Sequence, residues 1–368
     1  MRGHGFNCVG MMVILSLALV PMRSATGAET GDGALIAMID GVAERALQNP
    51  GAAGLSIGVA QRERVILIKG YGKADLENGV DATSASVFRI ASVTKQFTAA
   101  AILRLFERGR LGLDDDFTKY VDYPTQGKKV SIRHLLTHTS GIRDYTDVPG
   151  FFENGVSRDL PPENVLDGVR GLPLEFEPGT KWAYSNTGYH LLGMIIEKVT
   201  GVAYAKHMQD EFFTPLGLTG TRYDIGPEVI PGRARGYGVI NGAAANASHL
   251  SMTIPYSAGG LLSTGGDLVK WQLALRGGNA VSPESYRLMT TPTTLADGSS
   301  AGYGFGLFMS EVDGHRNFMH EGGIPGFNSI LVYFTEEDLS IAVISNSSAV
   351  SAGTVAADIA RGVFAEGS

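Results

Sequence analysis

The chain has 368 residues, of which 44% are hydrophobic and 18% are charged, a composition typical of a soluble globular protein with a large core. This composition excludes disordered and collagen-like classes. The net charge of −7 argues against nucleic acid as a partner.

Residues 1–28 have the pattern of a secretory signal peptide. Arg2 precedes an apolar run from Met11 to Val20, and small residues from Ser24 to Ala28 follow it. The run is shorter than the ~18 residues needed to span a bilayer, so we expect cleavage after Ala28 and no stable membrane insertion. The sequence therefore predicts a periplasmic or secreted protein. An uncleaved anchor is the alternative.

Cleavage at this position would change the charge and the thiol content of the protein. It would remove Arg2 and Arg23 and no acidic residue, which leaves 28 basic against 37 acidic residues and a net charge of −9. Cys8 is the only cysteine and lies in the signal. The exported protein would therefore have no disulfide and no thiol nucleophile.

The hydrophobic periodicity predicts strands at both ends of the chain and helices between them. After the signal, it predicts a helix over Ala34–Gln48 and two strands, Leu55–Gln61 and Arg64–Gly72, joined by a hairpin at Arg62-Glu63. The middle of the chain predicts helices over Thr94–Arg108, Ile132–Leu136, Thr187–Val199 and Tyr204–Phe213. The last third predicts a helix over Gly265–Arg276, strands over Tyr303–Met309, Phe327–Phe334 and Leu339–Asn346, and a closing helix over Thr354–Ala365.

This order favours a mixed α/β fold of the α+β kind. One mostly antiparallel sheet would combine N- and C-terminal strands and be covered by the terminal helices, with a helical lobe inserted at roughly 95–250. A cleft between the two lobes is where we expect a site.

The segment Gly54–Gly58, GLSIG, matches the G-x-S-x-G motif of serine hydrolases. That motif requires a helix directly after the serine, so that the hydroxyl lies on a strained turn. Here the residues after Ser56 continue as a predicted strand. We therefore expect Ser56 to be a residue of the first strand rather than a nucleophile.

His134 and His138 are four residues apart, which would place them on one face of a helix. The zinc motif with this spacing requires Glu directly after the first histidine, and Leu135 stands there. We expect packing or capping roles for both. A zinc hydrolase built on them is the metal-dependent alternative, and unchanged activity in EDTA would exclude it.

Ser92 and Lys95 form an S-x-x-K motif at the start of a predicted helix. Residues three apart lie on one helical face, so the lysine can reach the serine hydroxyl. Backbone N–H groups at a helix start also favour the negative charge of an acyl-transfer intermediate. The motif is short, however, and taken alone it favours an N-cap role for Ser92.

Two later motifs change this interpretation. Tyr184-Ser185-Asn186 stands just before a predicted helix, and His320-Glu321-Gly322-Gly323 stands just before a predicted strand. With S-x-x-K, Y-x-N and K/H-x-G in this order, the sequence resembles the serine β-lactamase and penicillin-binding hydrolase family, most closely its class C-like and D,D-carboxypeptidase/esterase branch. The resemblance includes 135–142 and 257–268, and it implies one β-lactamase/transpeptidase-like domain over residues 29–368.

The resemblance implies a role for each matching residue. Ser92 would be the acylated nucleophile, Lys95 its close partner and Tyr184 a proton relay, with either Lys95 or Tyr184 as the general base. Asn186 would bind a carbonyl or amide of the substrate. The backbone N–H groups of Ser92 and Gly323 would form the oxyanion hole, and no metal or organic cofactor is implied.

The triplet departs from the family pattern at its first two positions. Many relatives have lysine where this chain has His320, and a histidine is not a permanent cation at neutral pH. This weakens the case for β-lactam hydrolysis and leaves room for peptides of D-residues or small esters. Glu321 would either repel substrate carboxylates or pair with His320 and keep it protonated, so both are candidate substrate-binding residues.

We therefore expect an exported serine hydrolase that forms an acyl-enzyme on Ser92 and transfers the acyl group to water. Its substrate would be a small molecule or peptide with an amide or ester bond, of D-amino-acid peptide, ester or β-lactam type. The alternative is a catalytically idle receptor of the same fold that binds cell-wall peptides or penicillin.

Overall fold

The computed structural model describes residues 29–151 and 156–366. The predicted signal peptide and Cys8 lie outside these residues. None of the described helices combines the length and the apolar character needed to cross a bilayer.

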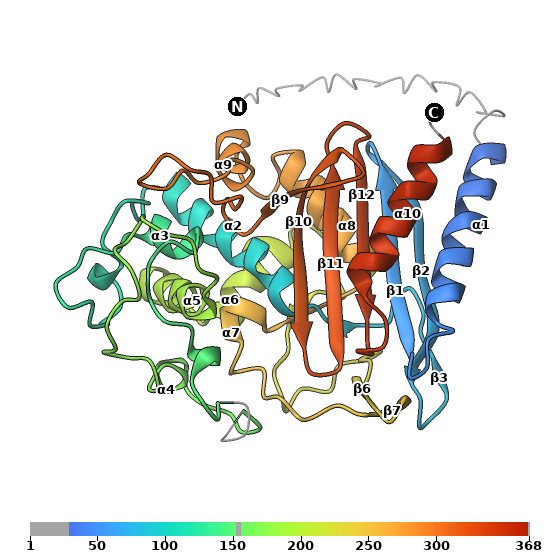
Figure 1. Ribbon diagram of the computed structural model, residues 1–368, viewed down its shortest axis with the longest axis horizontal. Coiled ribbons are helices and arrows are strands. Elements are labelled where there is room, and N and C mark those ends of the chain that lie inside the picture. Colours follow the sequence, from blue (N-terminus) through green and yellow to red (C-terminus); the bar gives the residue numbers. More distant parts are fainter. Residues whose placement is uncertain (1–28, 152–155, 367–368) are drawn as a thin grey trace, which may run out of the picture.

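A seven-stranded antiparallel sheet forms one half of the molecule (Figure 1). Its strand order is β3-β2-β1-β12-β11-β10-β9, so N-terminal and C-terminal strands meet where β1 pairs with β12. This confirms the sheet expected from the two ends of the sequence. The strands are β1 (Gly54–Gln61), β2 (Arg64–Asp75), β3 (Val80–Asp81), β9 (Phe308–Val312), β10 (His315–Ile324), β11 (Phe327–Phe334) and β12 (Leu339–Ser345).

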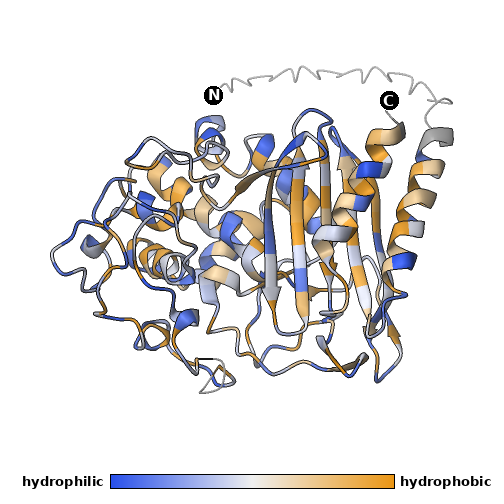
Figure 2. Ribbon diagram, viewed as in Figure 1, coloured by the Kyte–Doolittle hydropathy of each residue, from blue (hydrophilic) through white to orange (hydrophobic). Residues whose placement is uncertain are grey.

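Helices cover both faces of this sheet. The terminal helices α1 (Glu29–Ala46) and α10 (Ala352–Glu366) pack against each other and cover one face, as Figure 1 shows. Helix α8 (Gly265–Arg276) packs on the opposite face against β1 and β12. Strands β1 and β12 are buried along almost their whole length, because helices cover both of their faces. This explains their continuous apolar sequences, and Figure 2 shows hydrophobic residues in this part of the sheet.

The other half of the molecule is a mainly helical lobe (Figure 1). Ser185 begins its central helix, α5, by accepting a hydrogen bond from the Gly188 N–H at 3.2 Å, and Gly201 ends the helix with a φ of 74°. The helices of this lobe and its surroundings are α2 (Thr94–Glu107), α3 (Ile132–Leu136), α4 (Pro162–Val165), α5 (Asn186–Thr200), α6 (Tyr204–Met208), α7 (Tyr256–Gly259) and α9 (Pro283–Met289). Short strands form two small sheets: β4 (Phe88–Arg89), β8 (Leu261–Ser263) and β5 (Arg222–Tyr223), then β6 (Tyr237–Ile240) and β7 (Ala243–Asn246).

The structure corrects two predictions in the last third of the chain. The strand predicted over Tyr303–Met309 begins only at Phe308, because Gly306 has a φ of 75°, a turn conformation. The His320 motif does not precede a strand but lies inside β10, which the sequence prediction missed. A turn at Asp313-Gly314, with φ values of 51° and 85°, joins β9 to β10.

Ser56 is a buried residue of β1, as expected, and its surroundings explain the GLSIG pattern. Its hydroxyl accepts a hydrogen bond from the Gly265 N–H at the start of α8, at 2.9 Å. A Cβ at Gly58 would lie 2.2 Å from the Gly265 carbonyl oxygen. The second glycine of the motif thus allows α8 to approach β1, and the nucleophile-elbow interpretation is wrong.

Candidate active site

Ser92 lies in a single 3₁₀ turn, Ala91–Val93, between β4 and α2. Ala91 has a φ of 45°, a strained conformation for alanine, and the Ser329 hydroxyl holds the turn by donating to the Ile90 carbonyl at 2.7 Å. The serine side chain caps neither this turn nor α2. The N-cap interpretation of Ser92 is therefore wrong, and its hydroxyl is available for other contacts.

The Lys95 amine lies at the centre of the site. It is fully buried, and its Nζ lies 3.0 Å from Ser92 Oγ, 2.8 Å from Asn186 Oδ1 and 2.9 Å from the Ala258 carbonyl oxygen. Burial lowers the pKa of Lys95 to about 7, although the negative charge of Asp144 acts in the opposite direction.

The contacts show where the lone pair of Lys95 lies when the amine is neutral. A neutral amine has two N–H donors and one lone pair, and the two carbonyl-type oxygens, Asn186 Oδ1 and Ala258 O, can only accept. The lone pair is then directed at the third neighbour, the Ser92 hydroxyl. In this form Lys95 is placed to accept the serine proton.

Asp144 is a site residue that the sequence analysis missed. Its carboxylate accepts hydrogen bonds from the backbone N–H and from Nδ2 of Asn186, at 2.7 and 2.9 Å. Because Ser185 is the N-cap of α5, the Asn186 side chain is free of that role, and its oxygen faces Lys95. Asp144 thus fixes the orientation of the Asn186 amide.

Tyr184 lies on the other side of the lysine. Lys95 Nζ is 4.7 Å from the centre of its ring, and the Tyr184 hydroxyl lies near the Ser92 side chain. Burial raises the pKa of Tyr184 above its ordinary value, although the Ser92 side chain acts in the opposite direction. The phenol is therefore the group that keeps its proton, and the lysine is the group that can lose one.

The two histidines of the metal hypothesis have other roles. Helix α3 ends at Leu136, so His138 lies beyond it with a φ of 58°, and the expected shared helical face does not exist. The His138 ring accepts a hydrogen bond from the Ser185 N–H at 3.0 Å and packs against Tyr184. His134 forms the capping box of α3. In residues 29–151 and 156–366, no three His, Cys, Asp or Glu side chains are grouped to hold a metal.

The backbone around the nucleophile includes a donor without a protein acceptor. Within the described chain, no backbone or side-chain oxygen accepts a hydrogen bond from the Ser92 N–H. A Cβ at Gly322 would lie 2.9 Å from this nitrogen and 2.3 Å from the Ile90 oxygen, whereas a Cβ at Gly323 would meet nothing within 4 Å. Close approach of β10 to Ser92 therefore requires glycine at 322, and Gly323 faces open space.

His320 and Glu321 lie away from the substrate cavity. His320 is buried, with Nδ1 2.6 Å from the Glu321 backbone oxygen and Nε2 3.1 Å from the Tyr303 hydroxyl. Burial lowers the pKa of His320 to about 3, so the ring is neutral at neutral pH. The Glu321 side chain lies on the opposite face of the sheet, close to Gly353 of α10, because neighbouring strand residues point to opposite faces. Of the two alternatives for Glu321, pairing of its side chain with His320 does not occur.

A cavity of about 340 Å³ opens at Ser92, Tyr184, Asn186 and Gly323. The rest of its described wall is largely apolar and aromatic, and no charged side chain is among the described lining residues. These wall residues are Tyr145, Thr146, Phe151, Leu250, Ile254, Pro255, Ala258, Gly259, Ile324 and Pro325.

The S-x-x-K and Y-x-N motifs thus lie next to each other, and β10, which carries the third motif, lies against Ser92. The sequence model of the beta-lactamase family matches residues 39–363. The chain belongs to the beta-lactamase family. This is a family of serine hydrolases, and the structure has its β-lactamase/transpeptidase-like fold.

Two curated proteins and one solved structure show what this chain is similar to. Penicillin-binding protein 4* of Bacillus subtilis is 33% identical over 75% of this chain and 64% of its own length. The D-aminopeptidase of Gluconobacter oxydans is 30% identical over 81% of this chain and 56% of its own. The D-amino acid amidase from Ochrobactrum anthropi SV3, solved with L-phenylalanine amide, has a TM-score of 0.79 and 27% identity over 91% of this chain and all of its own. The chain thus spans about three fifths of the length of these first two relatives.

Proposed function

We propose that this protein hydrolyses an amide or ester through an acyl-enzyme on Ser92. The observation that carries the proposal is the buried Lys95 amine, 3.0 Å from Ser92 Oγ, with its pKa lowered to about 7. Near neutral pH about half of such an amine is unprotonated, so it can act as a base where an exposed lysine could not.

The reaction begins when neutral Lys95 accepts the Ser92 proton while Oγ attacks the substrate carbonyl carbon. The oxyanion then receives hydrogen bonds from the N–H groups of Ser92 and Gly323, each typically worth ~3 kcal/mol. Tyr184 donates its proton to the leaving nitrogen or oxygen as the bond to carbon breaks, and the Lys95 ammonium returns a proton to the phenol.

Water completes the cycle by attacking the ester carbon of the acyl-enzyme. Its proton passes to the Lys95 amine, and the acid departs as Ser92 Oγ recovers a proton. Asn186, held by Asp144, keeps the amine in position throughout and offers its amide to the substrate.

The surroundings of the site support an uncharged leaving group. His320 is neutral and does not line the cavity, so a leaving-group carboxylate would lack the fixed cation that a lysine at this position would supply. The apolar cavity wall supports a hydrophobic acyl group next to the reacting carbonyl. Because relatives include a D-aminopeptidase and a D-amino acid amidase, D-amino-acid amides and peptides are the first natural substrates to test.

A substrate panel tests this proposal. It contains p-nitrophenyl butyrate, D-phenylalanine amide, a D-alanyl-D-alanine peptide and nitrocefin, each with the wild type and the Ser92→Ala variant. We expect hydrolysis of the ester and the amide, slower or no hydrolysis of nitrocefin, and none by the variant. Covalent labelling of Ser92 without turnover of any substrate would instead support the receptor alternative.

We also propose export through the predicted signal of residues 1–28. Fractionation of cells that express the full chain should recover a form beginning at Glu29 outside the cytoplasm. Retention of the intact chain in the cytoplasm would contradict this.

A further inference from the structure

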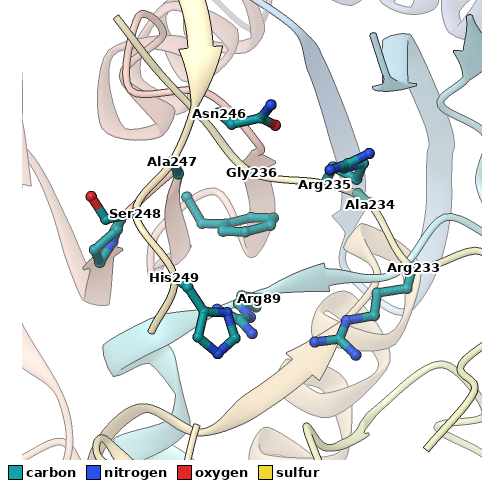
Figure 3. Close-up of a pocket in the computed structure, with 11 residues that line it drawn as sticks. Arg89, Arg233, Ala234, Arg235, Gly236, Asn246, Ala247, Ser248 and His249 are labelled. Carbon is teal, nitrogen blue, oxygen red and sulfur yellow. The ribbon is translucent and has the colours of Figure 1, made fainter. Parts of the chain in front are cut away.

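A second pocket, next to the catalytic cavity, is rich in arginine. It has a volume of about 400 Å³, and its wall includes Arg89, Arg233, Arg235 and His249. Figure 3 shows the side chains of Arg233 and His249 extending toward Arg89 from different segments. Such a concentration of positive charge is unusual in a chain with a net charge of −7.

Two carboxylates form ion pairs with the three arginines of this pocket. The buried carboxylate of Asp224 serves two guanidinium groups at once, with Nε of Arg89 at 2.8 Å and Nη2 of Arg233 at 2.9 Å. Glu77 lies 3.5 Å from Arg235. Three guanidinium groups thus form ion pairs with two carboxylates, and the charge of Asp75 also acts on Arg235.

Several guanidinium donors are also unused. Arg89 directs Nε at Asp224 and Nη1 at the Leu250 carbonyl, which leaves Nη2. Arg233 uses only Nη2, and over the described chain its Nε and Nη1 donate to no acceptor. The Arg233 side chain is 30% exposed, so these donors are open to a ligand.

Backbone contacts hold the cationic side chains in place. Arg89 belongs to β4, which pairs with β8. The Ala234 N–H donates to the Val87 carbonyl at 2.9 Å, and the Arg235 N–H donates to the Ala74 carbonyl at 2.9 Å. The arginines therefore stand on paired backbone rather than on a free loop, as a preformed binding site requires.

The pocket is continuous with the catalytic cavity. Pro325 lines both, and Leu250, which accepts the hydrogen bond from Arg89, lines the catalytic cavity. Arg89 stands three residues before Ser92, so their Cα atoms are at most about 11 Å apart. A substrate held at Ser92 can therefore reach the arginines with a short extension.

We propose that the arginine pocket binds an anionic group, a carboxylate, on the acyl part of the substrate. The proposal rests on the proposed function and names its substrate class: an acyl group that is apolar next to the reacting carbonyl and carries a carboxylate roughly 10 Å beyond it. Guanidinium groups recognise this group through paired, charge-assisted hydrogen bonds.

A matched pair of substrates tests the proposal. One is the mono-p-nitrophenyl ester of suberic acid, which ends in a carboxylate, and the other is the same ester with that carboxylate methylated. We expect the wild type to have a higher kcat/KM for the anionic ester, and Arg233→Gln to reduce the ratio of the two values roughly tenfold. The control is Arg361→Gln on α10, an arginine that also contacts two carboxylates, Asp313 and Asp358, and should keep the wild-type ratio.

The outcomes separate this proposal from the proposed function. An equal ratio in the wild type and Arg233→Gln, with both esters hydrolysed, would overturn the carboxylate site and leave the hydrolase assignment intact. Hydrolysis of neither ester by the wild type would overturn both. The methylated ester reports on the folded active site of each variant. Partial loss of structure in Arg233→Gln would lower both rates by the same factor, so the ratio still measures the effect of removing the arginine.

Discussion

Replacing Lys95 with Met should remove a pH dependence of stability that the buried amine imposes. The ordinary pKa of lysine is 10.5, and burial lowers that of Lys95 to about 7 in the folded protein. Between these values the unfolded chain binds a proton that the folded chain does not, so the free energy of unfolding rises with pH.

The slope is about 1.4 kcal/mol per pH unit where the two states differ by a whole proton. From about pH 7 to about pH 9.5 the wild type should therefore gain about 3 kcal/mol from this residue alone. The window ends below pH 10 because buried tyrosines, such as Tyr204, have a pKa raised by burial and would lower stability as the unfolded chain ionises. In Lys95→Met the gain should disappear.

The assay is urea unfolding of the wild type and Lys95→Met at both pH values. Other groups titrate in both proteins, so the difference between the two slopes isolates Lys95. Lys270→Met is the control, because this half-exposed lysine of α8 lies 3.5 Å from Asp267 and should leave the slope unchanged. Equal slopes in wild type and Lys95→Met would refute the argument that this lysine is neutral when folded.

Three further predictions concern the site and its support. The kcat/KM for an ester should rise through about pH 7 as Lys95 loses its proton. Asp144→Asn should move this rise to lower pH, because the negative charge of Asp144 raises the pKa of Lys95. A pH profile at the same position in Asp144→Asn would contradict this role of Asp144. Gly322→Ala should abolish activity and lower the melting temperature, because its Cβ would meet backbone atoms, whereas Gly323→Ala should melt at the wild-type temperature. An equal decrease in melting temperature for the two variants would be inconsistent with the packing. Burial lowers the pKa of His190 to about 4, so between about pH 6.5 and about pH 4 the histidine binds a proton in the unfolded chain but not in the folded one. Acidification through this range should therefore destabilise the wild type more than His190→Asn, and thermal melts at several pH values measure the difference.

Much of the sheet could be predicted from hydrophobic periodicity alone. Strands β1, β11 and β12 are long apolar runs, and the structure places them where the sequence does. Strand β10 was missed because it begins with three consecutive polar residues, His315 to Asn317, and its second half contains two glycines, so it shows no regular alternation of apolar and polar residues. The Asp313-Gly314 turn was the available signal, since Asp-Gly is a common two-residue hairpin turn.

The site was predictable in its residues but not in its electrostatics. The sequence motifs pointed to Ser92, Lys95 and Tyr184, which the structure brings together, yet only the fold shows that the amine is fully buried and its pKa lowered. Asp144 has no local signal, because it is 42 residues from its partner Asn186. The opposite orientation of Glu321 could have been foreseen from strand alternation, once β10 was recognised.

The most direct test of the account is the position of a covalent adduct. We would treat the wild type, Ser92→Ala and Ser56→Ala with a fluorophosphonate and locate the adduct by peptide mass spectrometry. We predict one adduct on the peptide that contains Ser92, absent from Ser92→Ala and retained in Ser56→Ala, whose serine is buried in β1. An adduct that persists in Ser92→Ala, or that lies on another serine of the wild type, would contradict the central claim that Lys95 activates Ser92.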